Sequence, residues 1–180
     1  GVSSAASDVY KRQILETGEG EGPADADGTV DGKNGILMPG MINTHCHIPM
    51  IPFRSLGDDC PDRLRRFLFP LELEAMNREL IGQSTRYGVC ELLLSGVTSV
   101  LDMYYFEDQV AAACEEMGIR AYVGQTIIDM ETCDSKNTDQ SLAMCEELIR
   151  KWKGHERIRP VVAPHATNTN PPEVLKAAYE

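Results

Sequence analysis

Apolar, β-branched runs alternate with amphipathic helical patterns along most of this chain, and this order constrains its fold more than any other feature. The runs predict strands over 36–44, 97–103, 119–128 and 158–164. The spacing of apolar residues predicts helices over 77–94, 107–117 and 139–152, and a last helix that opens at Asn170-Pro171-Pro172. Such alternation favours an α/β fold, with a parallel sheet and helical crossovers.

Two architectures fit this order. Four βα units make the N-terminal half of a (β/α)8 TIM-type barrel, and an open doubly wound sheet is the alternative. No Gly-X-Gly-X-X-Gly or phosphate-binding loop follows a predicted strand, so the nucleotide-binding version of the open sheet lacks support. The long connection over 48–73 has the length of a functional loop and carries one predicted short helix around Leu64, Phe67 and Leu68.

The first predicted strand runs into Asn-Thr-His-Cys-His at 43–47. Side chains alternate between the two faces of a strand, so His45 and His47 are expected on one face and Cys46 on the other. Two imidazoles on one face can bind one divalent cation. A polar strand face without a metal is the alternative interpretation, and the position at the end of a barrel strand favours the metal.

A third histidine, His165, follows the fourth predicted strand in Ala-Pro-His-Ala. The active sites of parallel barrels lie at the carboxyl ends of the strands. A single histidine at a strand end is more often structural, but its agreement with His45 and His47 favours a shared site. His155, in a charged turn, is expected to be an ordinary surface residue.

Composition excludes several classes of function. The chain has 17 Lys and Arg against 28 Asp and Glu, a formal net charge of −11, and no basic stripe, which disfavours nucleic-acid binding. No apolar run approaches the roughly 20 residues that a membrane span requires. The six cysteines form no Cys-X-X-Cys pair and no secretory signal is visible, which predicts reduced thiols in a cytoplasmic protein.

Neither end of the chain reads as a natural terminus. Residues 1–13 resemble one reading frame of a transposase adapter used in sequencing libraries, and we interpret them as an adapter-derived scar, with a natural disordered N-terminus as the alternative. Residues 171–180 begin a helix and stop inside it without a C-cap glycine. Both features predict that the chain is part of a longer protein.

Four blocks resemble the amidohydrolase superfamily, in particular the branch of methylthioadenosine/S-adenosylhomocysteine deaminases and triazine chlorohydrolases. They are Pro-Gly-Met-Ile-Asn-Thr-His-Cys-His-Ile-Pro-Met at 39–50, Phe-Pro-Leu-Glu at 69–72, Ser-Gly-Val-Thr-Ser-Val-Leu-Asp-Met-Tyr at 95–104 and Ala-Pro-His-Ala at 163–166. The resemblance implies that 36–180 is the first half of a metal-dependent barrel and that 14–35 is a remnant of the family's small β-sandwich domain.

The resemblance also implies roles for single residues. His45 and His47 match the first two metal ligands, and Glu72 and His165 match residues that contact the substrate. A solvated glutamate at a helix start is the alternative for Glu72, and metal ligation is the less favoured alternative for His165. Gln125 stands where adenosine-type members carry arginine, and Ala166-Thr167-Asn168 also departs from their pattern, which questions an adenosine-like substrate.

The implied activity is hydrolysis of a carbon–nitrogen bond that is not a peptide, the deamination of a purine-, nucleoside- or triazine-like ring with a divalent metal, Zn²⁺ by preference. The remaining ligands and the acid/base residues are expected beyond residue 180, so that residues 1–180 alone are expected to be inactive. A homo-oligomer and a small-molecule substrate are further implications. The alternatives are a non-catalytic binding protein on a βα scaffold and an amidohydrolase of another class, such as a chlorohydrolase or a guanine-type deaminase.

Overall fold

The computed structural model describes residues 3–8, 13–20 and 22–179, and the chain divides into two compact units, 1–39 and 40–180. In the first unit, strand β1 (Ser3–Asp8) pairs antiparallel with β2 (Gln13–Glu19). β1 thus lies within the predicted scar, of which residues 1–2 and 9–12 are outside the described residues. The origin of residues 1–13 and the assignment of 14–35 to a sandwich remnant stay predictions.

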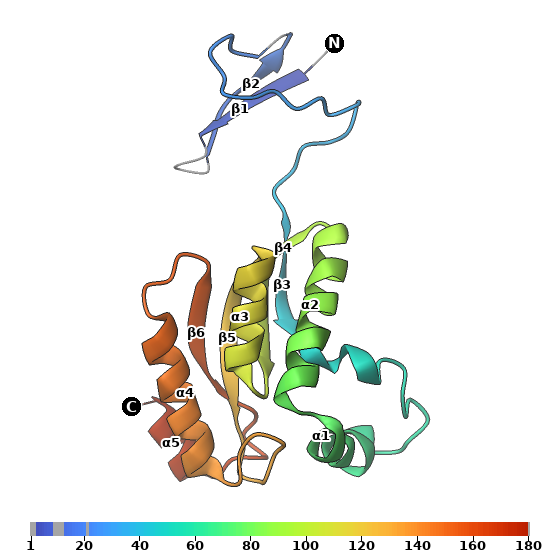
Figure 1. Cartoon of the computed structure of the whole chain (residues 1–180), viewed down its shortest axis with the longest axis vertical. Helices are drawn as coiled ribbons and strands as arrows, with labels where there is room; N and C mark the ends of the chain where they lie inside the picture. Colours follow the sequence, from blue (N-terminus) through green and yellow to red (C-terminus); the bar gives the residue numbers. More distant parts are fainter. Residues whose placement is uncertain (1–2, 9–12, 21, 180) are drawn as a thin grey trace. The chain divides into compact units, whose positions relative to one another are not determined.

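The second unit contains a four-stranded parallel sheet in the order β3-β4-β5-β6 (Figure 1). Its strands are β3 (Met41–Cys46), β4 (Val97–Tyr104), β5 (Arg120–Ile127) and β6 (Ile158–Pro164). Neighbours along the chain are neighbours in the sheet, as in a barrel. The predicted α/β class, with four βα units in one parallel sheet, is therefore confirmed.

The first strand is shorter than predicted. Residues 36–40 are not in a strand, and β3 begins at Met41, which pairs with Val97, the first residue of β4. Residues 36–40 have no partner strand, and Pro39 has no amide hydrogen to donate to a ladder. Residues 29–31, whose Thr-Val-Asp run could suggest a short strand, are irregular and exposed.

The helices follow the predicted order closely. They are α2 (Arg78–Leu94), α3 (Glu107–Met117), α4 (Thr138–Trp152) and α5 (Pro172–Tyr179). The Asn77 side chain accepts a hydrogen bond from the Leu80 amide at 3.0 Å, and Asn137 caps α4 in the same way. The long connection holds three short helices instead of the one predicted: the 3₁₀ helix η1 (Ile48–Phe53), the π-helix η2 (Leu64–Leu68) and α1 (Phe69–Ala75).

The core lies between one face of the sheet and helices α2 to α4, which cover it (Figure 1). Val100 and Val123 point into this core and are buried. The opposite face of the sheet carries apolar side chains that remain exposed, among them Leu101 at 38% and Tyr122 at 48%. All six cysteines are free thiols, and none of the described helices is long and apolar enough to cross a membrane.

Helix α2 packs against the segment that follows the histidine pair, and glycine permits this contact. A Cβ atom on Gly88 would lie 2.6 Å from Cγ2 of Ile48 and 3.3 Å from its carbonyl oxygen. Ile48 is buried directly after His47. The backbone of α2 can therefore approach the end of β3 only because residue 88 has no side chain.

We expect Gly88→Ala to lower the free energy of unfolding by about 1–3 kcal/mol, because the new methyl group would displace Ile48. Gly82→Ala in the same helix is the matched control. Its Cβ would meet only the movable Arg86 guanidinium, at 3.3 Å, and Gln109 Oε1, at 3.7 Å, so that helix propensity should raise stability by about 0.5–1 kcal/mol. Urea denaturation measures both variants, and equal effects would contradict the close-packing explanation.

Candidate metal and substrate site

The histidine pair lies at the carboxyl end of β3. The rings of His45 and His47 are neighbours, with centroids 5.1 Å apart and planes nearly perpendicular. Between them, the Cys46 thiol donates to the Leu101 carbonyl at 3.3 Å on the neighbouring strand β4. The two imidazoles are thus close enough to serve one cation.

A backbone carbonyl orients the second imidazole. Nδ1 of His47 lies 2.6 Å from the carbonyl oxygen of Met103, near the end of β4. A carbonyl oxygen only accepts hydrogen bonds, so this contact selects the tautomer with hydrogen on Nδ1 and leaves the lone pair of Nε2 free. Protein metal sites use this arrangement to direct a histidine toward its ion, and the residues present therefore fit two ligands of a divalent cation.

Two imidazoles do not complete a tetrahedral site. Across residues 3–8, 13–20 and 22–179, no group of three or more His, Cys, Asp or Glu side chains is placed to hold a metal ion. His45 and His47 are the metal-ligand candidates in the described part of the chain. Further ligands have to come from other residues, from the substrate or from water.

Glu72 is buried beside this pair. It lies in α1, is 4% exposed and accepts a hydrogen bond from the Tyr104 hydroxyl at 2.7 Å. The Tyr104 ring is also 6.3 Å from the ring of His47. Burial raises the pKa of the Glu72 carboxyl, while hydrogen bonds from Tyr104 and Tyr105 oppose this rise. Glu72 is therefore not a solvated helix-start residue, whereas Glu74, two positions on, is exposed.

His165 follows β6 and reaches the same end of the sheet. Its amide donates to the Ile127 carbonyl at 2.9 Å, Nδ1 lies 2.9 Å from the Thr169 hydroxyl, and its ring is 5.9 Å from the ring of Phe69 in α1. Burial lowers the pKa of His165, and the charges of His47 and Arg65 lower it further. This histidine is thus held neutral near pH 7. His155 instead packs on Trp152 outside this region.

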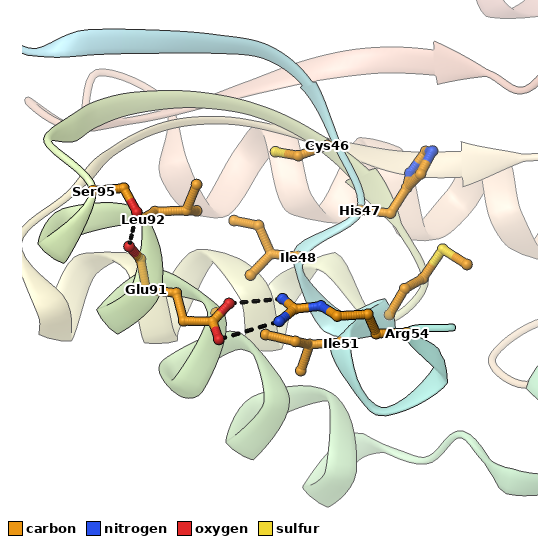
Figure 2. A pocket seen from close by; sticks show the side chains of 10 residues that line it. Cys46, His47, Ile48, Ile51, Arg54, Glu91, Leu92 and Ser95 are labelled. Atoms are coloured by element: carbon orange, nitrogen blue, oxygen red, sulfur yellow. Dashed lines mark hydrogen bonds and ion pairs between the residues drawn. The ribbon is translucent and has the colours of Figure 1, made fainter. Parts of the chain in front are cut away.

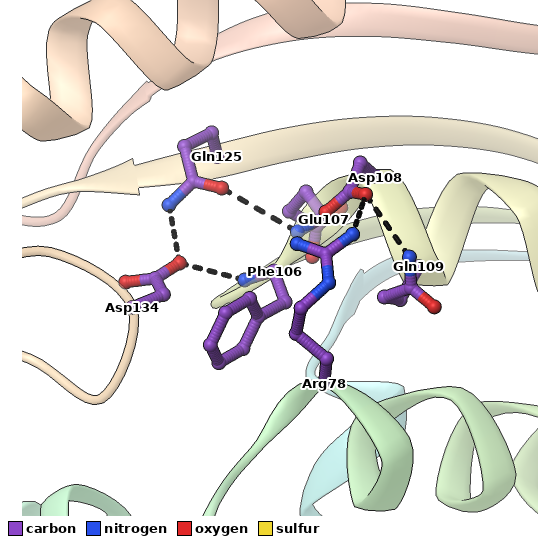
Figure 3. A network of polar contacts seen from close by, with 7 residues as sticks. All are labelled: Arg78, Phe106, Glu107, Asp108, Gln109, Gln125 and Asp134. Atoms are coloured by element: carbon purple, nitrogen blue, oxygen red, sulfur yellow. Dashed lines mark hydrogen bonds and ion pairs between the residues drawn. The ribbon is translucent and has the colours of Figure 1, made fainter.

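Gln125 is engaged inside the protein. This side chain on β5 is 2% exposed; its amide nitrogen donates to Asp134 at 2.9 Å and its oxygen accepts from the Glu107 amide at 3.4 Å (Figure 3). Asp134 also accepts from the amide of Phe106 at 2.7 Å. Gln125 therefore ties the loop before α4 to the start of α3.

A groove of about 340 Å³ lies between η1 and α2, on the helix side of β3. Arg54 and Glu91 form an ion pair of 2.7 Å across it, and Figure 2 shows the His47 ring pointing away from that pair. Neither Glu72 nor His165 lines this groove. Cys46 and His47 do line it, so the groove adjoins the strand-end site on the helix side of β3.

Sequence reasoning missed two contributors to this site, Tyr104 as the donor to Glu72 and Asp102 as the acceptor for the Ile48 amide at 2.6 Å. The alternation along β4 holds a signal for Asp102. It shares a face with Val100 and is fully buried, so a carboxylate occupies a core position of a strand. Tyr104 carries no comparable signal, because tyrosine is common in strands.

The lowered pKa of His165 predicts a pH dependence of stability. As pH falls below about 6.5, the unfolded chain binds a proton at this residue and the folded chain does not, so the free energy of unfolding should decrease. His165→Gln should remove that part of the decrease, and His155→Gln, the control, should retain it. Urea denaturation between pH 5 and 7.5 measures the effect, and parallel profiles for wild type and His165→Gln would contradict it.

Comparisons with known proteins identify similar chains. The chain is 41% identical over 146 residues to the 5-methylthioadenosine/S-adenosylhomocysteine deaminase of Thermodesulfovibrio yellowstonii, covering 80% of this chain and 33% of that protein. An adenosine deaminase structure from Xanthomonas campestris with bound zinc has a TM-score of 0.76 at 33% identity, over 79% of this chain and 33% of that one.

A triazine hydrolase structure from Arthrobacter aurescens matches with a TM-score of 0.78 over 91% of this chain and 42% of that chain; at 21% identity it supports the fold alone. The chain thus spans about a third of the length of its curated relatives. The family model of the amidohydrolases matches residues 36–180. The histidine pair, the parallel βα units and these matches together establish that the chain belongs to the amidohydrolase family.

Proposed function

We propose that the protein containing this chain is a metal-dependent hydrolase that deaminates an adenosine-like ring. The observation that carries the proposal is the histidine pair at the end of β3, in which the Met103 carbonyl frees Nε2 of His47 for a cation. The 41% identity to a methylthioadenosine/S-adenosylhomocysteine deaminase supports the substrate class. The zinc in the adenosine deaminase structure supports Zn²⁺ as the cation.

In this proposal, the residues of this chain bind the cation and orient the substrate. His45 and His47 would hold the cation, which supplies the Lewis acidity that makes water nucleophilic at neutral pH. Glu72, fixed by the Tyr104 hydroxyl, offers a buried acceptor to a substrate hydroxyl such as that of a ribose. His165, neutral and held through Thr169, would hydrogen-bond the ring or its substituent. Proton transfer to the leaving amine requires residues beyond those of this chain.

A chlorohydrolase of triazine-like rings is a second candidate, which Gln125 supports. Arginine is expected at that position in adenosine-type members. The Gln125 side chain instead donates to Asp134 and accepts from the backbone amide of Glu107. Both reactions would use the same histidines and differ in the group that leaves. The products, ammonia or chloride, therefore distinguish the two candidates.

A non-catalytic binding protein on the same scaffold is the alternative from another class. The sequence encoded downstream of residue 180 distinguishes a binding protein from an enzyme. A histidine followed three residues later by glutamate, and later a strand-end aspartate, would favour catalysis. The proposal extends to a cytoplasmic homo-oligomer. The six free thiols support the compartment, and the oligomer rests on family resemblance alone. The 180-residue chain by itself should lack turnover.

The test uses the full-length protein with 5-methylthioadenosine and with a chlorinated triazine. Replacing both His45 and His47 with alanine should reduce metal content and lower turnover by more than about 100-fold, since loss of outer contacts alone costs 10–100-fold. His155→Ala is the control and should match wild type. Ammonia release supports deamination and chloride release supports the second candidate. Turnover that survives removal of metal by a chelator would refute the proposal.

A further inference from the structure

Two carboxylic acids are buried together behind the histidine pair. Asp102 lies near the end of β4 and Glu107 is the first residue of α3, and both side chains are 0% exposed. Asp102 Oδ1 accepts the Ile48 amide at 2.6 Å. Asp102 Oδ2 and both carboxyl oxygens of Glu107 have no hydrogen-bond partner among the groups that the structure describes. Three buried oxygens without donors would be costly if both groups were ionised.

One proton held between the two carboxyl groups would supply a missing hydrogen bond. The two carboxyls lie within hydrogen-bonding reach of each other, and a protonated carboxyl is a donor. Asp102 is the better site for the negative charge, because it accepts the Ile48 amide at 2.6 Å, whereas the Tyr104 amide near Glu107 makes no hydrogen bond of ordinary geometry to it. In agreement with this, burial and the neighbouring Asp102 raise the pKa of Glu107 well above its usual range.

The Cys46 thiol is the other candidate donor near Asp102. Its single hydrogen is directed to the Leu101 carbonyl at 3.3 Å, and Asp102 Oδ2 remains without a partner. Glu107 is therefore the group placed to supply the missing hydrogen bond.

The pair connects directly to the candidate metal ligand. Asp102 binds the amide of Ile48, and the next residue on β4, Met103, binds Nδ1 of His47 at 2.6 Å. These two contacts hold the peptide after His47 and the His47 ring against one strand end. Glu107 is in turn fixed from β5, because its amide donates to Gln125 (Figure 3).

We propose that Asp102 and Glu107 are positioning residues: Glu107 in its acid form donates to Asp102, whose carboxylate anchors the Ile48 amide and so sets the direction of the His47 ring. The purpose of this positioning, to orient a metal ligand, rests on the proposed metal-dependent function. Its geometry, however, can be tested without metal or turnover, because the tautomer of His47 reports the ring's contact with Met103.

The experiment uses the full 180-residue chain with Glu107→Gln, Glu107→Leu and, as a control, Asp108→Asn. Glutamine keeps a donor toward Asp102, and leucine keeps bulk without a donor. Asp108→Asn removes a neighbouring first-turn charge that pairs with Arg78 and is not part of the carboxyl pair. Long-range ¹H–¹⁵N spectra of the histidines report the tautomers, and titration with Zn²⁺ reports affinity.

We expect wild type, Glu107→Gln and Asp108→Asn to keep His47 protonated on Nδ1. Glu107→Leu should lose this single tautomer and weaken Zn²⁺ binding by about 10–100-fold, the usual effect of losing an outer contact of a metal ligand. His165, held by Thr169, should keep its spectrum in all variants and serves as an internal reference. A Glu107→Leu chain that is less stable but has an unchanged His47 spectrum would overturn the proposal.

Three further outcomes decide the remaining cases. If Glu107→Gln behaves like Glu107→Leu, the donated hydrogen is not the link and the proposal fails. If Glu107→Leu does not fold, the ¹³C shift of the Glu107 carboxyl in wild type at pH 7 decides, because an ionised Glu107 would overturn the proposal and a protonated one supports it. If wild type binds Zn²⁺ too weakly to measure, as two ligands alone predict, the His47 tautomer still decides the positioning role, and the metal content of the full-length protein decides the proposed function.

Discussion

The parallel pairing of β3 with β4 is the interaction on which the rest of the site depends. It places the end of β3 beside Asp102, Met103 and Tyr104 of β4. Each of these residues makes one contact that orders the site: Asp102 with the Ile48 amide, Met103 with the His47 ring and Tyr104 with Glu72. One strand end thus orders both a candidate metal ligand and a candidate substrate contact.

The site is assembled from groups that are expensive to bury. Glu72, Asp102 and Glu107 are all less than 5% exposed, and burial raises the pKa of each carboxyl. Apolar residues of similar size would avoid this desolvation cost. Groups with strongly shifted pKa values cluster at functional sites, so the concentration of three such acids at one end of the sheet agrees with a chemical role for that end.

Much of the fold could be predicted because its signals are local. The helix caps at Asn77 and Asn137 and the apolar spacing of α3 and α4 depend on residues within one or two turns. The start of β3 could not be predicted in this way. Ile36 and Leu37 have strand-forming character, but they are 90% and 79% exposed because no neighbouring strand extends far enough to pair with them.

In the candidate site, too, some features follow from the local sequence and others only from the tertiary structure. The sequence by itself determined that His45 and His47 share one strand end, since alternation along a strand is a property of the backbone. Only the tertiary structure decided that Glu72 is buried under Tyr104, that Gln125 is occupied by Asp134 and that Asp102 meets Glu107. The Glu72 and His47 contacts join residues 32 and 56 positions apart along the chain. Such pairs form only once the helical crossovers bring the strand ends together, because no local pattern encodes which distant side chain will supply a hydrogen bond.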